Sequence, residues 1–407
     1  MIKRIVLISN SFPYGYGESF LEPEMAYVPD GIDYYIVPIH KYPNRLRDVS
    51  KNTKVVDLEQ VESKKNIWIY FRSIFSVLFL HGVRELISCK KISIRNILAL
   101  VSFIYSGRVL ARRIKKCLLL SNIPVDSETI IYSYWMDSSA ISAYILSDKK
   151  AKVFCRTHGA DLYDERTKYN HQFLRKFICT QFDGVFPISE QGKRYLERRT
   201  GCREKIHSSH LGVVDHGVQR YFENRSIKVI SCSNVIHLKR IDLIISALSK
   251  LKNEKIQWVH FGDGELMEKI KETAAEKLES GTYQFFGRVS NSRIHDYYQN
   301  NSITLFVNAS DTEGIPVSIM EAISYGIPVV ATDVGGVSEC VHNGINGVLI
   351  PPDDADALAN AILKILKLNH SDYYTLRKNA RMVFEKEWNA KKNFSEFYNM
   401  MTQYGGN

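Results

Sequence analysis

Residues 303–322 read ITLFVNASDTEGIPVSIMEA, and this stretch decides the fold class. Residues 303–307 are mostly apolar without alternation, which is typical of a strand buried on both faces of a parallel sheet. Residues 308–315 are mainly polar or small, and an apolar helical pattern follows. Pro316 fits the first turn of that helix, where its missing N–H costs no hydrogen bond. A buried strand, a loop and a helix in this order indicate one unit of a doubly wound α/β fold.

The same alternation of strand and helix recurs on both sides of this stretch. Strands are expected at residues 4–9, 34–39, 129–134, 152–156, 184–188, 228–232, 257–261, 283–286, 303–307, 328–331 and 348–350. This series predicts an α/β protein with two Rossmann-like domains facing each other across a cleft. Ligands of such folds bind at the carboxyl ends of the strands, so the cleft is the expected site.

A break in this rhythm marks the seam between the two halves. Residues 210–226 read HLGVVDHGVQRYFENRS and carry turn residues rather than a strand or helix pattern. We therefore expect domains at residues 1–212 and 213–385. Residues 386–407 are expected to form a C-terminal helix that packs back toward the N-terminal domain.

Two acids in the opening stretch are candidates for ligand binding. Glu313 lies in the loop before the predicted helix, and Glu321 lies inside it. Loop amides and a helix N-terminus form an anion site, and the second acid could accept hydroxyls of a sugar. The alternative is that Asp311 or Thr312 caps the helix and that Glu321 is exposed. Spacing alone leaves both interpretations open.

The two acids with seven residues between them, in EGIPVSIMEA, match a known signature. With the following SYGIPVVATDVGGVSECVHNGINGVLI, the chain resembles the retaining GT-B glycosyltransferases of the "glycosyl transferases group 1" (GT4-like) family over about residues 228–352. The resemblance implies that Glu313 contacts the donor sugar and Glu321 the ribose of a nucleotide-diphosphate sugar. It also implies an acceptor-binding N-terminal domain and a donor-binding C-terminal domain. The residues expected beside the donor between the acids are Gly314, Ile315, Pro316 and Val317.

A cation is expected opposite this loop. Lys239 follows a buried strand at the start of a helix, where it can neutralise the diphosphate leaving group. A merely exposed lysine is less favoured there because of the helix dipole. The family usually has an arginine five residues earlier, where this chain has Asn234. Arg240 could substitute for that arginine, or Lys239 and backbone amides could act without it.

Two further turns of the second half are candidate donor contacts. Gly262 and Gly264 follow one expected strand, and Arg288 and Val289 follow the next. Glycine permits a close approach of backbone to ligand. In the family, these turns line the base and phosphate pockets. The alternative is that the glycines are only turn residues.

In the first half, Tyr14, Gly15 and Gly17 follow the first expected strand. They resemble the glycine-rich loop that meets the donor phosphates and the acceptor in this fold. His158 lies between a strand end and Gly159. A lone histidine is more often structural, but this one matches a His–Gly segment of the family, so we expect it to contact the transferring sugar.

Metal and cofactor signals are weak. Asp354 and Asp356 resemble a DxD metal motif, but they open a helical pattern, and capping explains them. The seven cysteines are scattered and suit a reducing compartment rather than disulfides or zinc. The first residues turn polar too early for a signal peptide. We expect a cytoplasmic protein with no metal and no cofactor besides the nucleotide sugar as donor substrate.

The net charge of +10 is local. Residues 61–120 hold twelve Lys and Arg against two acids, whereas the remaining chain is balanced. Residues 66–88 and 92–120 are predicted to form two helices with apolar faces, interrupted by Lys and Arg. Their longest uncharged runs are eleven and twelve residues, too short for a membrane-spanning helix of about 20.

These two helices have two interpretations. They could be core helices with a solvated basic face, or they could dock on an anionic leaflet, peripheral at the inner face of the plasma membrane. The basic residues at stake are Arg108, Arg112, Arg113, Lys115 and Lys116. Their charge is too interleaved with apolar residues for a nucleic-acid stripe, so no nucleic-acid partner is expected.

Three functions remain at this stage. The favoured one is a metal-independent retaining hexosyltransferase. It would move a sugar from a UDP-sugar to a growing, lipid-linked surface glycan such as capsule, exopolysaccharide or lipopolysaccharide. The second is a nucleotide-sugar epimerase or phosphorylase of the same fold. The third is a non-catalytic basic protein that binds membrane or nucleic acid.

Overall fold

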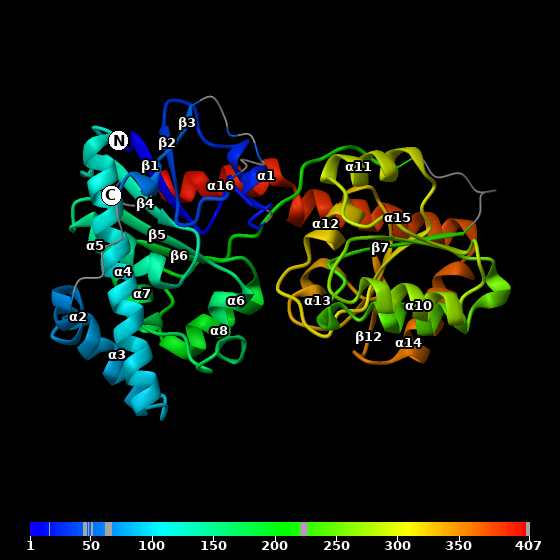
Figure 1. The fold of residues 1–407 in the computed structure, drawn as a ribbon. Coiled ribbons are helices and arrows are strands. Elements are labelled where there is room, and N and C mark those ends of the chain that lie inside the picture. Colours follow the sequence, from blue (N-terminus) through cyan, green and yellow to red (C-terminus); the bar gives the residue numbers. More distant parts are fainter. Residues whose placement is uncertain are drawn as a thin grey trace. The chain divides into compact units, whose positions relative to one another are not determined.

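The computed structural model describes residues 1–15, 17–43, 47, 49, 52–61, 67–219 and 227–403. The chain forms two compact units (Figure 1). Unit 1 comprises Met1–Leu211 with Lys391–Asn407, and unit 2 comprises Gly212–Ala390. Lys64, Lys65, Asn66, residues 220–226 of the expected seam and residues 404–407 of the expected C-terminal segment lie outside the described residues.

Unit 1 is built on a six-stranded sheet with the order β3-β2-β1-β4-β5-β6, and every neighbouring pair is parallel. The strands are β1 (Arg4–Ser9), β2 (Asp33–Pro38), β3 (Thr53–Val55), β4 (Thr129–Ser133), β5 (Lys152–Thr157) and β6 (Gly184–Pro187). Five were predicted within a residue or two. The sequence analysis missed β3, a three-residue edge strand.

The α-helices of unit 1 cover both faces of this sheet. They are α1 (Leu21–Met25), α2 (Ile67–Ile74), α3 (Val77–Ser88), α4 (Ile94–Leu120), α5 (Ser138–Ser147), α6 (Gly159–Leu162), α7 (Arg175–Gln181), α8 (Glu190–Thr200) and α16 (Ala390–Gln403). The single helix predicted at residues 66–88 is wrong: it is two helices, separated because the Oγ of Ser76 accepts a hydrogen bond from the Phe79 amide and caps α3.

The alternation of side chains along β1 separates the two layers. Val6 and Ile8 pack with α4 and α5, whereas Ile5 and Leu7 pack with α1 and α16. The sheet is therefore buried on both faces, as its apolar strands predict. The C-terminal helix α16 (red in Figure 1) belongs to this core through Phe397, whose ring lies 5.4 Å from that of Tyr132.

Helix α4 has 27 residues and is the one helix in the described ranges long and apolar enough to cross a membrane. Its buried residues explain that composition, because Leu100, Ile104 and Ile114 lie in the core of unit 1. Gly107 brings α4 close to α5: a Cβ at this position would lie 2.9 Å from the side chain of Ile141. Burial therefore accounts for part of the apolar character of α4, since 39% of its most apolar 18-residue window is buried.

Unit 2 repeats the plan with a parallel sheet of order β12-β11-β10-β7-β8-β9. The strands are β7 (Lys228–Cys232), β8 (Gln257–Phe261), β9 (Tyr283–Phe285), β10 (Leu305–Asn308), β11 (Val329–Thr332) and β12 (Gly347–Ile350). The α-helices are α9 (Ile241–Ser249), α10 (Met267–Lys277), α11 (Asn291–Asn300), α12 (Val317–Ser324), α13 (Val337–Cys340), α14 (Ala355–Leu366) and α15 (His370–Val383). The predicted fold class of two Rossmann-like α/β domains is confirmed.

In both sheets the strand order reverses at one place. In unit 1, successive connections leave in opposite directions from β1 and β4, and in unit 2 from β7 and β10. A crevice forms outside the carboxyl ends of the strands at such a switch point, and ligands of doubly wound folds bind there. The loops that follow these four strands are therefore where the predicted site residues are sought.

Candidate functional site

The loops after β7 and β10 meet at the switch point of unit 2. The loop after β7 contains a 3₁₀ turn, His237–Lys239, directly before α9, so Lys239 precedes the helix rather than starting it. The Asp311 amide in the loop after β10 donates a hydrogen bond to the Leu238 carbonyl at 2.9 Å. Backbone contact between the loops thus fixes the distance between the side chains they carry.

Lys239 and Glu313 meet across this contact. The ammonium of Lys239 lies 2.5 Å from Oε1 of Glu313. The same oxygen accepts hydrogen bonds from Ser310 Oγ at 2.7 Å and Asn308 Nδ2 at 3.2 Å. Glu313 is buried and Lys239 is about one fifth exposed, so the ammonium keeps an open side. A cation held in this way can neutralise an arriving anion.

The loop that carries Glu313 is held from the other side by two glycines. Gly335 has φ +56°, and a Cβ there would lie 2.0 Å from the Glu313 carbonyl oxygen. The Gly336 amide donates to the Gly314 carbonyl at 2.9 Å. Glycine is required here because the two loop backbones touch. The role of Gly335 in positioning Glu313 was not predicted from the sequence.

Helix α12 begins at Val317. Pro316 is the N-cap residue in extended conformation, so it lies just before the first helical turn in which it was predicted. No side chain caps this helix, so the alternative that Asp311 or Thr312 does so is wrong. Ile315 is buried beneath the loop. Gly314, Ile315, Pro316 and Val317 therefore bring the helix N-terminus to the same edge as Lys239.

Glu321 is buried inside α12, which excludes the alternative of an exposed acid. Burial raises the pKa of its carboxyl to about 7. The hydrogen-bond donor recorded for this carboxylate is Asn291 Nδ2, at 3.3 Å from Oε1. A buried carboxyl with so little compensation is suited to accept hydroxyl groups of a ligand.

The predicted donor glycines of the next loop have a structural role. Gly262 has φ +139°, and a Cβ there would lie 1.8 Å from the Ser233 carbonyl oxygen. A Cβ on Gly264 would lie 2.4 Å from the Val235 carbonyl oxygen. Both positions need glycine so that the loops after β7 and β8 can touch. The turn interpretation is thus sufficient for them, and it leaves donor contact as a prediction.

The remaining predicted donor contacts are less defined by the structure. Arg288 is exposed after Gly287, whose φ is +64°, and Val289 is half-buried. Asn234 is exposed after β7. These residues lie in loops at the carboxyl ends of β7 and β9, as predicted, and their contact with a donor stays a prediction.

Arg240 is paired with carboxylates of the chain itself. Its guanidinium forms ion pairs with Asp242 and Asp311 at 3.2 Å and with Asp353 at 2.7 Å. These partners raise the pKa of Arg240. The expectation that Arg240 replaces the missing arginine at position 234 is not supported by this geometry, because three acids already neutralise it. Lys239 is then the cation that faces Glu313.

At the switch point of unit 1, the acid Glu18 organises the loop after β1. Its Oε2 accepts the amides of Ser11 at 2.7 Å and Phe12 at 2.8 Å. Its Oε1 accepts the Asn10 amide at 2.8 Å and the indole N–H of Trp135, in the loop after β4, at 2.6 Å. A carboxylate of the chain thus occupies the amides that could have cradled an anion. The sequence analysis missed Glu18.

The predicted residues of this loop lie next to the hydrogen bonds that Glu18 accepts, which we call the Glu18 clamp. Gly15 has φ +66°, and a Cβ there would lie 2.9 Å from the ring of Tyr42, so the position favours glycine. A Cβ on Gly17 would only reach Ser11 Oγ at 3.7 Å. Tyr14 lines a cavity of about 250 Å³ together with Arg113. The structure therefore brings together two residues predicted for the acceptor side.

His158 follows β5 and is buried among aromatic rings. Its ring centroid lies 4.4 Å from Trp135, 4.8 Å from Tyr134 and 5.4 Å from Phe20. Burial, with the charge of Arg156, holds the pKa of His158 well below its usual value, so the imidazole is neutral. Neither ring nitrogen has a hydrogen-bond partner among the described residues. A neutral imidazole of this kind can donate to or accept from a sugar hydroxyl.

The predicted basic face of α4 divides into three parts. Arg113 donates to the carbonyls of Leu58 at 3.0 Å and Val61 at 3.3 Å, so it packs the loop onto α4 and is not part of an exposed face. The exposed members are Arg112, Lys115 and Lys116. Arg108 is half-buried and lines an apolar groove.

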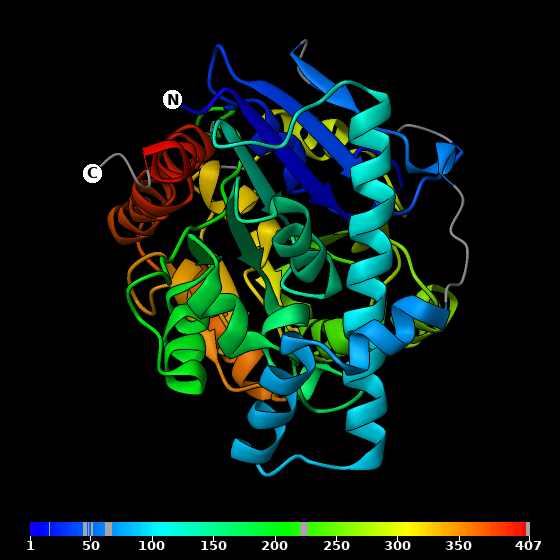
Figure 2. The same ribbon diagram turned by 90° about the vertical axis from the view of Figure 1, so that its left-hand side faces the viewer.

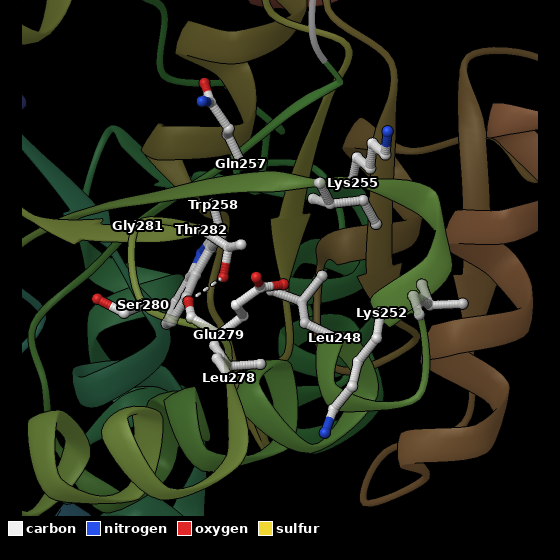
Figure 3. Close-up of a pocket in the computed structure, with 12 residues that line it drawn as sticks. Leu248, Lys252, Lys255, Gln257, Trp258, Leu278, Glu279, Ser280, Gly281 and Thr282 are labelled. Carbon is white, nitrogen blue, oxygen red and sulfur yellow. Dashed lines mark hydrogen bonds between the residues drawn. The ribbon is translucent and has the colours of Figure 1, made fainter.

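Another pocket of unit 2 lies apart from these residues (Figure 3). It has a volume of about 300 Å³ and is lined by Leu248, Trp258, Leu278 and Thr282, among others. It sits at the amino ends of β8 and β9, because Gln257 at its rim is the first residue of β8. No predicted site residue lines it.

Metal binding finds no support in the parts of the chain that are described. They contain no group of three His, Cys, Asp or Glu side chains that could hold a metal ion. Asp354 of the apparent DxD motif accepts the Ala357 amide at 2.8 Å and caps α14, as the capping interpretation predicts.

The chain is similar in sequence to known glycosyltransferases. Residues 219–383 match the family described as "Glycosyl transferases group 1". The chain is 27% identical over 254 residues to the amylovoran biosynthesis glycosyltransferase AmsK of Erwinia amylovora, covering 60% of the chain and 61% of the relative. It is 32% identical over 231 residues to the O-antigen biosynthesis glycosyltransferase WbnH of Escherichia coli, covering 53% and 65%. The chain thus spans about three fifths of the length of these relatives.

The fold comparison extends over the whole chain. Anabaena HepE, solved in complex with UDP and glucose, matches 98% of this chain and 99% of its own with a TM-score of 0.67 at 16% identity. At this identity the likeness shows the fold, which is that of GT-B glycosyltransferases. The predicted resemblance to the group 1 glycosyltransferases is confirmed, and the match includes Glu313 and Glu321.

Proposed function

We propose that the chain is a retaining, metal-independent glycosyltransferase that moves a sugar from a UDP-sugar to a growing surface glycan. The observation that carries this proposal is the contact of Lys239 with Glu313 at the switch point of unit 2. It is supported by the match of residues 219–383 to group 1 glycosyltransferases. UDP is favoured as the nucleotide because HepE binds it. A capsule-like or lipopolysaccharide acceptor is proposed because AmsK is named for amylovoran biosynthesis and WbnH for O-antigen biosynthesis.

The chemistry follows from the charges at this edge. The diphosphate of the donor competes with Glu313 for the ammonium of Lys239, which neutralises the charge that develops as the sugar–phosphate bond breaks. The N-terminus of α12 adds its amides to that anion. The released carboxylate of Glu313 can then accept hydroxyls of the donor sugar.

Glu321 and His158 complete the proposed contacts. Glu321 takes the ribose hydroxyls, which supply the hydrogen bonds that its buried carboxylate lacks. His158 takes a hydroxyl of the transferring sugar through a neutral ring nitrogen. Transfer on the same face of the sugar lets the departing phosphate accept the proton of the acceptor hydroxyl. We further propose that the enzyme works in the cytoplasm.

A panel of nucleotide sugars tests this proposal. A donor that binds the native state adds RT ln(1 + [L]/Kd) to the unfolding free energy and so raises the melting temperature. We expect UDP-sugars to do so, and one of them to be consumed when an oligosaccharide acceptor is added, with the anomeric configuration retained in the product by NMR. An epimerase would convert the donor without any acceptor, and a phosphorylase would need inorganic phosphate. Either result would replace the proposed reaction.

A further inference from the structure

Helix α2 of unit 1 exposes most of its apolar side chains together with Arg72, whereas it buries the hydroxyl side chain of Ser73. Ser73 is fully buried, whereas Trp68 is 73% exposed and Phe71 is also exposed. The pattern continues through the link after α2, where Phe75 is 85% exposed, to the first residue of α3, Val77, which is also exposed. A helix that only packs on a protein core places its polar side chains in solvent. The reversed pattern indicates that this face meets an apolar partner.

This face is held firmly on unit 1. Figure 2 shows α2 crossing α4, with α3 beside it. Gly82 of α3 lies so close to α4 that a Cβ would be 2.4 Å from the side chain of Leu100. The exposed apolar residues are therefore presented by a packed layer of helices.

A groove of about 860 Å³ lies along the exposed face. Its apolar wall comes from Trp68, Phe71 and Phe75, and further along from Leu78. Among the described residues that line it, Arg72 and Arg108 are the charged ones. The groove is thus apolar along most of its length and cationic at one place.

The two arginines lie near each other, and within the described residues no ion pair joins either of them to a carboxylate. Desolvation lowers the pKa of Arg108, and the charge of Arg72 lowers it further. Nε of Arg108 is buried and has no hydrogen-bond partner within the described part of the chain. Residues 67–84 and 86–120 contain no Asp or Glu. Two close guanidinium groups in this setting are suited to hold one anion, above all a phosphate.

We propose that this face of α2 and α3 docks on a leaflet of anionic phospholipid. Trp68, Phe75 and Val77 enter the boundary between headgroups and acyl chains, where interfacial helices place such residues. Arg72 and Arg108 bind a lipid phosphate in the groove. The exposed Arg112 and Lys115 continue the positive charge along α4.

Charge complementarity favours an anionic leaflet over a second copy of the chain as the partner of this face. An anionic leaflet meets both the apolar wall and the two arginines, whereas a symmetric contact with a second copy would bring like charges together. Other basic residues of the stretch are occupied: Lys91 donates to the Asn170 carbonyl and Arg95 to that of Lys168. The proposal goes beyond glycosyl transfer and holds whether or not the chain transfers a sugar.

Co-sedimentation with vesicles tests the charged part. We expect the protein to bind phosphatidylcholine vesicles containing phosphatidylglycerol and to bind pure phosphatidylcholine far less. Arg72→Gln with Arg108→Gln should weaken this binding about 25-fold, taking about 1 kcal/mol per cation and 1.4 kcal/mol per tenfold. Lys269→Gln with Lys277→Gln on α10 removes the same charge from exposed positions of unit 2 and should change it little. Equal loss in both pairs would overturn the proposal.

Trp68 reports the apolar part without any substitution. Trp258 and Trp388 are buried, and Trp135 is half-buried and bonded to Glu18, so brominated phospholipids should quench mainly the emission of Trp68, and Trp68→Phe should abolish most of that quenching. Phe75→Ser should weaken binding at least tenfold, and Tyr374→Ser, at a 62% exposed position on α15, should not. Circular dichroism checks that each variant is folded.

Three outcomes would contradict the proposal. The first is absence of quenching of Trp68 in bound protein. The second is competition by free glycerol phosphate at the concentration of the lipid phosphate, which would make the site one for a soluble anion. The third is a dimer in light scattering that Phe75→Ser dissociates while wild-type protein fails to bind vesicles, which would make this face an interface between copies.

Discussion

The ammonium of Lys239 lies 2.5 Å from Oε1 of Glu313, joining the loops that follow β7 and β10. An equivalent contact joins the loops after β1 and β4 in unit 1, where the indole of Trp135 donates to Glu18 at 2.6 Å. In each unit, one glutamate thus bonds to a side chain of the neighbouring loop at the switch point. The difference is that Glu18 is already saturated by amides, whereas Lys239 keeps an open side for an anion.

Substitution of either partner of the first pair should remove transfer. Lys239→Gln and Glu313→Gln should each lower kcat by about a hundredfold or more, since loss of one stabilising group in a polar site costs about that much. Both variants should melt within a few degrees of wild type, because Ser310 and Asn308 still bond to position 313. Steady-state kinetics with the preferred donor measures the effect. Near-normal kcat in both would show that the pair is structural.

The pKa of Glu321 predicts a pH dependence. Because burial raises it to about 7, the folded state favours the protonated acid, and this preference is lost as pH rises from about 4.5 to 7. Glu321→Gln should therefore gain stability over wild type across that window, by up to about 3 kcal/mol above pH 7. Urea unfolding at several pH values measures the difference. A constant difference from pH 5 to 8 would show that the pKa of Glu321 is not raised.

The same acid should link nucleotide binding to pH. The ionised carboxylate is the form that accepts ribose hydroxyls, so UDP should bind more tightly as pH rises from 6 to 8 and should release a proton near pH 7. Titration calorimetry in two buffers of different ionisation enthalpy counts that proton. The Glu321→Gln variant should show no such release, and equal release by both proteins would assign the proton to another group.

Alanine substitutions at two glycines with positive φ can distinguish the cost of backbone strain from the cost of a steric clash between loops. Gly335→Ala would place a Cβ 2.0 Å from the Glu313 carbonyl oxygen, whereas Gly344, with φ +78°, has nothing within 4 Å of that position. Gly344→Ala should cost about 1 kcal/mol for its conformation, and Gly335→Ala about 3 kcal/mol or more. Chemical denaturation compares them, and only Gly335→Ala should impair UDP binding. Equal costs would contradict the close contact.

Glu18 should stabilise unit 1. Glu18→Ala leaves the amides of Ser11 and Phe12 and the indole of Trp135 without acceptors, at about 1–3 kcal/mol each where they stay buried. We expect a loss of at least about 3 kcal/mol in unfolding free energy and a change in Trp135 emission. Glu22→Ala, in the same segment, removes an ion pair between its 57% exposed carboxylate and Arg47 and should cost under about 1 kcal/mol. Equal losses would exclude the clamp.

Much of the fold could be predicted because parallel strands are buried on both faces. The runs of β1 (RIVLIS) and β7 (KVISC) are mostly apolar without alternation, and their predicted bounds agree with the structure within a residue or two. The edge strand β3 was missed because three residues containing a lysine carry no such signal. The break between α2 and α3 was missed because Phe75 and Ser76 interrupt no apolar pattern and contain neither glycine nor proline.

Some features of the site could likewise be predicted from the sequence and others could not. Glu313, Glu321 and Lys239 could be found because their spacing to neighbouring strands is local. The competition for Arg240 by three acids could not, because Asp311 and Asp353 are distant in sequence. The clamp of Glu18 on Trp135 likewise depends on the pairing of β1 with β4.

The central claim is that the edge of unit 2 at Lys239 and Glu313 binds the diphosphate of a nucleotide sugar. Titration calorimetry of UDP with wild type, Lys239→Gln and the charge-matched control Lys269→Gln tests it most directly. We predict binding by wild type and the control, and affinity at least tenfold weaker for Lys239→Gln. Absence of binding by any nucleoside diphosphate, or equal affinity in all three proteins, would contradict the claim.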